Sequence, residues 1–213
     1  MADPDKAAGP RHDFALHPLW DDLSELDPAS VAEKSGATAR QEEGGTVYTI
    51  CFLASDYEFR MGDRKVTSPP GRPELDYYPK IVLLAYLVQS AKGPSPGLAG
   101  RETGPHSLPW GDLFFTGPHE LPKSQLATAF GDDPEALGRA SGLVGAVPNG
   151  KLAWKARVLP NVEVYWYLEP ADDEFPAECR YNFDANICYY LGLDMIFGLT
   201  NCLADSLVSL KGS

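Results

Sequence analysis

The clearest strand signal in the sequence is the alternation of side chains along residues 162–169. Valine, tryptophan and leucine occupy every second position, and this spacing places them on one face of a pleated strand. Pro170 ends the pattern, since proline has no N–H group to donate to a strand neighbour. A carboxylate-rich turn and a second strand pattern at 180–184 follow. The sequence therefore predicts a hairpin with an acidic tip.

Further strand patterns, rich in β-branched and aromatic residues or bounded by turns, occur in residues 46–53, 57–61, 65–67 and 151–159. Helical spacing or helix-boundary residues occur in residues 19–26, 29–34, 80–91, 123–130, 135–143 and 194–210. The helix expected at 80–91 is apolar on every side, as is typical of a helix in the middle of a core. No strand–helix–strand unit repeats, so we predict an α+β fold. A mainly antiparallel sheet would pack around this buried central helix, with a C-terminal helix completing the chain.

The ends of the chain and its long loop suggest one folded unit. Residues 1–17 are polar and lack any period, so we expect a disordered or loosely docked arm there, followed by a single α+β domain over residues 18–213. Residues 93–109 form a long loop rich in glycine and proline, and loops of this length are usually functional or disordered. A short repeat, GPHSLP at 104–109 and GPHELP at 117–122, brackets residues 110–115, which we expect to form a short strand or a buried aromatic turn.

The charge of the chain excludes some partners. Thirty acidic and 18 basic residues give a formal net charge of −12, which would repel nucleic acid and anionic membrane surfaces. The longest apolar run, residues 81–88, is too short to span a bilayer. The first residues show no basic region followed by an apolar one, so no secretory signal is expected. These features indicate a soluble, cytoplasmic protein.

Four cysteines stand at positions 51, 179, 188 and 202. No pair has the short spacing of a zinc site or a redox-active pair. We therefore expect separate thiols, with a disulfide or a soft-metal site as the alternative.

Two remote segments carry the candidate polar chemistry. Asp172, Asp173 and Glu174 could bind Mg²⁺ or Ca²⁺, but their spacing lacks the pattern of a calcium loop, and a solvated acidic turn is the commoner explanation. His119, in the second copy of the repeat, could act as a metal ligand or a base, or could bond a nearby carbonyl within its turn. A metal site built from His119, Asp172, Asp173 and Glu174 requires the loop and the hairpin tip to meet in space.

The aromatic residues suggest a binding site rather than a catalytic one. Phe115 and Trp166 could line a pocket for a flat ligand, with His119, Asp173 and Glu174 as polar contacts, or could simply fill the core. The GxSxG, GxGxxG and Walker lysine motifs are absent from the sequence. This absence weakens the case for hydrolase, dinucleotide or nucleotide chemistry and favours a non-enzymatic role.

Several short segments resemble an uncharacterised family of anaerobic bacteria and archaea that is known as a domain of unknown function. They include Asp173–Pro176 with the following Asn182–Asp184, the 83–87 helix and the 126–134 segment. The resemblance covers roughly residues 30–210. Some longer relatives look as if they carry an iron–sulfur cysteine motif, which this chain lacks. The resemblance implies accessory work around anaerobic redox or corrinoid enzymes.

Three functions follow as hypotheses. The first is a ligand-binding or accessory module that holds a small molecule or partner protein between the 93–122 loop and the acidic tip, with a tetrapyrrole or corrinoid as a candidate cofactor. The second is a divalent-metal enzyme that uses His119 and the acidic tip. The third is a structural subunit of a larger complex.

Overall fold

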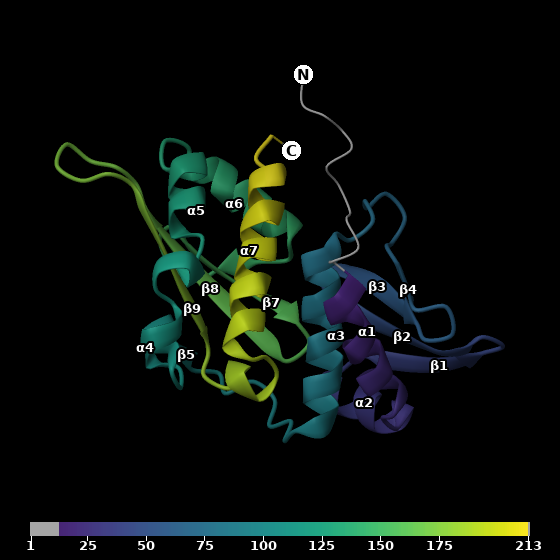
Figure 1. Ribbon diagram of the computed structural model, residues 1–213. Helices are drawn as coiled ribbons and strands as arrows, with labels where there is room; N and C mark the ends of the chain where they lie inside the picture. The colour runs from purple at the N-terminus through teal and green to yellow at the C-terminus, as the bar shows by residue number, and fades with distance from the viewer. Residues whose placement is uncertain (1–12, 213) are drawn as a thin grey trace.

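The computed structural model describes residues 13–212 and contains two antiparallel sheets with helices between and around them (Figure 1). The helices are α1 (Asp13–Ser24), α2 (Pro28–Ser35), α3 (Tyr77–Lys92), α4 (Gly111–Phe114), α5 (Lys123–Phe130), α6 (Pro134–Leu143) and α7 (Leu193–Ser209). The strands are β1 (Thr38–Glu42), β2 (Gly45–Phe52), β3 (Ser55–Arg60), β4 (Lys65–Thr67), β5 (Glu102–Thr103), β6 (Val147–Pro148), β7 (Ala153–Leu159), β8 (Val162–Glu169) and β9 (Glu178–Asp184). Short 3-10 turns are η2 (Pro105–Ser107), η3 (Gly117–His119) and η4 (Ile187–Tyr189). The predicted α+β class and C-terminal helix are confirmed.

The strands divide into two sheets, a feature that the sequence did not indicate. One sheet has the order β1-β2-β3-β4 and the other the order β5-β9-β8-β7-β6, and all the pairings are antiparallel. The two sheets approach each other where β2 meets β7. There the Leu53 N–H donates to the Val158 carbonyl at 3.2 Å, so a backbone hydrogen bond links the two sheets.

Helix α3 is the buried central helix that the sequence predicts. Nine of its residues are buried, and they lie on every side of the helix. It contacts α1 and α2 on one side and α7 on the other (Figure 1). The buried apolar residues of both sheets and of these helices form one continuous core cluster.

The ends of α2 follow the predicted signals. The Asp27 carboxylate accepts backbone N–H bonds from Ala29 at 3.4 Å and Ser30 at 3.0 Å, and Gly36 ends the helix at φ 73°. A residue distant in the sequence also bonds a carbonyl group at the C-terminus of α2, because the Tyr86 hydroxyl donates to the Ser35 carbonyl at 2.6 Å. The local cap is thus tied to the central helix.

Three local expectations differ from the structure. Residues 13–17 of the expected arm belong to α1, whereas residues 1–12 lie outside the described residues. Residues 111–114 form one turn of helix, α4, instead of a short strand. Strand β1 was not predicted, because its residues are mostly polar and largely exposed and show no strand pattern. Its backbone pairing with β2 stabilises it. Within residues 13–212, no helix has the length and apolar character needed to cross a bilayer.

Candidate functional site

A cleft of about 780 Å³ opens beside the C-terminal half of helix α7. Its other walls come from the β2–β3 hairpin, the 71–76 segment and the first residues of α3. Cavities of roughly 300–1,000 Å³ are the usual size of small-molecule sites. The cleft is therefore large enough to enclose an organic molecule.

The walls of the cleft are largely apolar and aromatic. Aromatic side chains line it from four elements, β2, β3, α3 and α7, namely Phe52, Tyr57, Tyr78 and Phe197. The Phe52 and Tyr57 rings are tilted against each other, with centroids 6.1 Å apart, and both are buried. Tyr78 is 66% exposed at the rim, so one aromatic face is free for contact with a ligand.

The charged lining of the cleft is predominantly acidic. The lining contains three carboxylates, those of Glu74, Asp76 and Asp205, and a single guanidinium, that of Arg72. One Asp205 oxygen accepts a bond from the Gln125 amide at 2.8 Å. The Asp76 side chain makes no capping bond to α3, and no described residue forms an ion pair with it. These two carboxylates retain capacity to accept further hydrogen bonds.

Cys202 lies in the lining as a neutral thiol. Burial raises its pKa to about 12, and the negative charges of Asp205 and Asp76 add to the effect. A protonated thiol is a poor nucleophile and a poor metal ligand. The four cysteines are all free, in agreement with the separate thiols that the sequence predicts.

The predicted histidine lies next to the cleft and not beside the hairpin tip. His119 is exposed in η3, where its ring stacks on Phe114 at 4.6 Å and meets the edge of Phe197 at 5.6 Å. Both copies of the GPHxLP repeat form 3-10 turns, in which Leu108 and Leu121 are buried and both histidines are exposed. The leucines thus anchor the repeat to the core.

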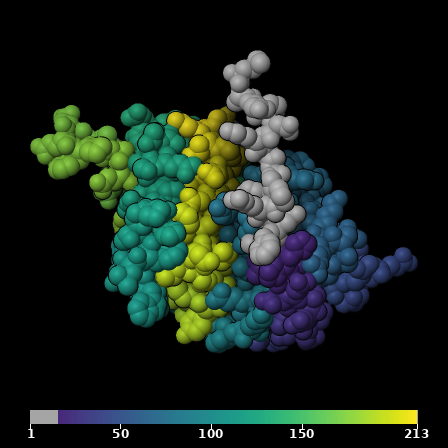
Figure 2. Space-filling model, in the orientation of Figure 1, coloured from purple at the N-terminus to yellow at the C-terminus, as the bar shows by residue number. Residues whose placement is uncertain are grey.

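The acidic tip stands clear of the body of the protein. The β8–β9 hairpin projects from the molecule, and its end is solvated (Figures 1 and 2). Asp172 accepts backbone N–H bonds from Glu174 at 2.9 Å and Phe175 at 2.7 Å, and these bonds lower the pKa of its carboxyl group. Asp173 and Glu174 are exposed. The tip has the features of a solvated turn closed by Asp172.

The four candidate metal ligands do not gather into a site. Over residues 13–212, no group of three or more His, Cys, Asp and Glu side chains is arranged to hold a metal ion. His119 lies against Phe114 and Phe197, whereas Asp172, Asp173 and Glu174 lie on the projecting hairpin.

The two predicted aromatic walls belong to the core. Trp166 is fully buried and its indole N–H donates to the Ser141 hydroxyl at 3.2 Å. Phe115 is also buried and lies against Phe183 of β9, with ring centroids 6.5 Å apart. Neither residue lines the cleft.

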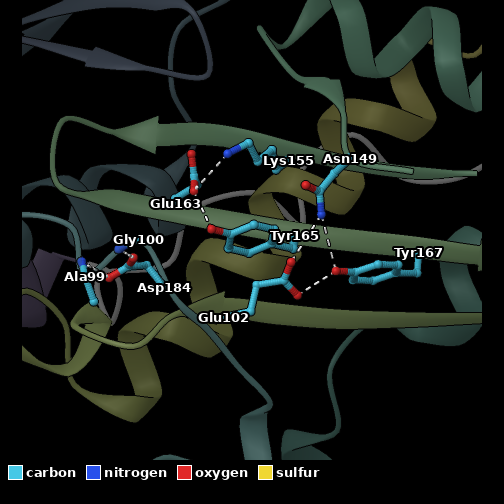
Figure 3. A network of polar contacts seen from close by, with 9 residues as sticks. All are labelled: Ala99, Gly100, Glu102, Asn149, Lys155, Glu163, Tyr165, Tyr167 and Asp184. Carbon is cyan, nitrogen blue, oxygen red and sulfur yellow. Dashed lines mark hydrogen bonds and ion pairs between the residues drawn. The ribbon is translucent and has the colours of Figure 1, made fainter. Parts of the chain in front are cut away.

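A polar network covers the outer face of the β5–β9 sheet (Figure 3). Glu102 accepts hydrogen bonds from the Tyr167 hydroxyl at 2.5 Å, from Asn182 at 3.0 Å and from Asn149 at 3.1 Å. Burial raises the pKa of the Glu102 carboxyl group, but these three bonds and the positive charge of Arg180 together outweigh burial, so the pKa lies below its ordinary value. Burial, followed by the bond to Glu102, raises the pKa of Tyr167 to about 12.

The remaining polar groups of this network are also paired. The Tyr165 hydroxyl donates to Glu163, which also lies 3.7 Å from the Lys155 ammonium. The buried Asp184 carboxylate accepts N–H bonds from Ala99 at 2.9 Å and Gly100 at 2.8 Å (Figure 3). Because these groups already have partners, the network acts as a structural tie between strands and the 97–100 loop. The cleft, where Asp76 and Asp205 keep unused oxygens, is the better candidate for a ligand site.

The comparisons with known proteins agree with the resemblance found in the sequence. The family described as a domain of unknown function, DUF3786, matches residues 27–206. The chain belongs to this family. No match is found among curated proteins or among solved structures. The family region includes both long walls of the cleft, since α7 up to Ser206 and the β2–β3 hairpin lie within it.

Most of the cleft has no direct signal in the sequence. Asp76 and Asp205 are remote in the chain, and Asp76 precedes a predicted helix whereas Asp205 lies within one. The proline- and glycine-rich segment before α3 has the composition of an ordinary connector. Asn201, Asp205 and Ser209 form a polar stripe along α7, at a spacing of four residues. This stripe is the feature of the sequence that indicates a polar wall of the cleft.

Proposed function

We propose that the protein is a ligand-binding accessory module and that its ligand occupies the cleft between α7 and the β2–β3 hairpin. The observation that supports this proposal is the size of the cleft, about 780 Å³, combined with its aromatic walls. Its described lining contains neither histidine nor methionine, and the Cys202 thiol is neutral. This donor set suits an organic molecule better than a metal-centred cofactor.

The cytoplasmic location and the link to anaerobic redox or corrinoid metabolism remain part of this proposal. A tetrapyrrole or corrinoid absorbs visible light, so the protein purified from its native host tests the cofactor directly. A coloured protein whose colour is lost on denaturation would place such a cofactor in this family. A colourless protein that takes up neither haem nor a corrinoid would remove the cofactor while leaving the cleft as the site.

Binding at the cleft is tested with a neutral apolar probe, naphthylmethanol, titrated into isotope-labelled protein. Amide resonances of residues in the lining, among them Gly71, Gly198 and Asn201, are expected to shift in proportion to occupancy. Ser206→Trp fills the cleft from α7 and should abolish the shifts. Ser124→Trp, an exposed substitution on α5, is the matched control and should leave binding unchanged.

The titration of the unmodified protein decides the proposal without relying on the variants. If naphthylmethanol shifts no lining amide at any soluble concentration, or shifts only amides elsewhere, the cleft is not a site for apolar ligands.

A further inference from the structure

The carboxylates of the cleft stand next to aromatic faces. Asp205 belongs to α7 and Asp76 directly precedes α3, and the negative charges of both act on the Cys202 thiol, which also lines the cleft. Phe197 of α7 and Tyr78, at the start of α3, line the same cleft. The cleft thus places negative charge and aromatic surface around one volume.

Each of these features favours the same kind of guest. A carboxylate with unused oxygens accepts hydrogen bonds from an ammonium group, and the bond is stronger than one between neutral groups. An aromatic face also attracts a cation through its quadrupole. An anionic guest would meet three carboxylates and one guanidinium, so its own charge would oppose binding.

We infer that the cleft selects organic cations, that is, protonated amines carried on an aromatic or aliphatic body. This inference rests on the proposed function, since it names the ligand class of the same site. The apolar body would lie against Phe52, Tyr57 and Phe197, while the ammonium group lies between Asp76 and Asp205. The third carboxylate, that of Glu74, is on the rim beside Arg72 and steers the approach of the cation.

The neighbouring groups leave the two aspartates available. The Gln125 amide uses one oxygen of Asp205, so the second oxygen can accept from a ligand. Burial raises the pKa of the Tyr57 phenol, and the positive charge of Arg72, the cation of the lining, partly offsets this rise. Among the described residues, Arg72 forms no ion pair with Asp76 or Asp205. A positive ligand can therefore bind without first breaking an internal salt bridge.

The test compares two probes of nearly the same shape, naphthylmethylamine, which is protonated at neutral pH, and naphthylmethanol, which is neutral. Dissociation constants are obtained from the amide shifts of the lining residues. Exposed ion pairs are individually weak, so we expect the amine to bind about three- to tenfold more tightly than the alcohol. This advantage should shrink as the salt concentration is raised.

Three variants identify the residues responsible. Asp76→Asn and Asp205→Asn should each reduce the preference for the amine while leaving the affinity for the alcohol unchanged. Asp132→Asn changes the net charge equally at an exposed position outside the lining, and it should leave the preference intact.

The outcomes separate this inference from the proposed function. If the alcohol binds in the cleft but the amine binds no more tightly, or if neither aspartate variant lowers the preference, the inference is overturned and the proposed function stands. If neither probe shifts a lining amide, both are overturned.

Discussion

The Tyr167 hydroxyl donates to the Glu102 carboxylate with 2.5 Å between the two oxygens. This bond joins β8, in the middle of its sheet, to β5, an edge strand of two residues. So short a strand has little backbone pairing of its own, because β5 pairs with β9 through Glu102 and Thr103 alone. The side-chain network therefore holds the end of the glycine- and proline-rich loop against the sheet.

Glu102→Gln should destabilise the protein by about 1–2 kcal/mol, because a glutamine amide places N–H groups where donors already converge. Urea unfolding monitored by circular dichroism measures the change. Glu169→Gln, an exposed substitution on β8, is the control and should change stability by less than about 0.5 kcal/mol. Equal effects of the two substitutions would contradict the structural role of Glu102.

The same carboxylate should make stability depend on pH in the acidic range. The pKa of Glu102 in the folded state lies below its ordinary value of 4.5, so folding favours the ionised form. Its contribution is complete above the unfolded-state pKa and is lost as the pH falls through the lower folded-state pKa. The stability difference between wild type and Glu102→Gln should therefore shrink below about pH 4.5. Urea midpoints measured at neutral and acidic pH test this, and a pH-independent difference would refute it.

Trp166→Phe should cost about 2–4 kcal/mol, because it opens a cavity in the core and removes the hydrogen bond to the buried Ser141 hydroxyl. Trp110→Phe is the matched control, because the Trp110 side chain is 76% exposed. This substitution should change the free energy of unfolding by no more than about 0.5 kcal/mol. Chemical denaturation of both variants provides the measurement. A large loss for Trp110→Phe would indicate that its indole has a structural role.

Gly111→Ala should disrupt the packing of α4 against η2. A Cβ atom at Gly111 would lie 2.0 Å from the Pro105 carbonyl oxygen, so the backbone has to move, at a cost of about 2 kcal/mol. Gly142→Ala, near the end of α6, meets no atom within 4 Å and should be neutral or stabilising. Thermal unfolding distinguishes the two, and a neutral Gly111→Ala would show that the turn adjusts freely.

Local patterns in the sequence predicted local structure well. The alternation around Trp166 predicted β8, and helix-boundary residues predicted a helix at 29–34, within the observed α2. These features depend on neighbours in the chain, where side-chain period and backbone preference act directly.

The functional site could not be predicted in the same way. Asp76 and Asp205 line the same cleft only because α3 and α7 pack together, and no local pattern encodes that packing. The sequence drew attention to His119 and Asp172–Glu174 because their side chains are chemically versatile. In the structure, one is stacked on aromatic rings and the others are solvated. Chemical versatility alone does not reveal which groups retain unused hydrogen-bonding capacity.

The hydrogen bond from Leu53 to Val158 has a consequence for how the molecule opens. It joins the two sheets, and Leu53 itself also lines the cleft. A ligand that contacts both Leu53 and α7 would bind only while the two sheets are in contact. Such binding stabilises the contact, so the sheets separate less often. The Leu53 amide hydrogen should then exchange with solvent more slowly when the cleft is filled, which makes this one amide a built-in reporter of occupancy.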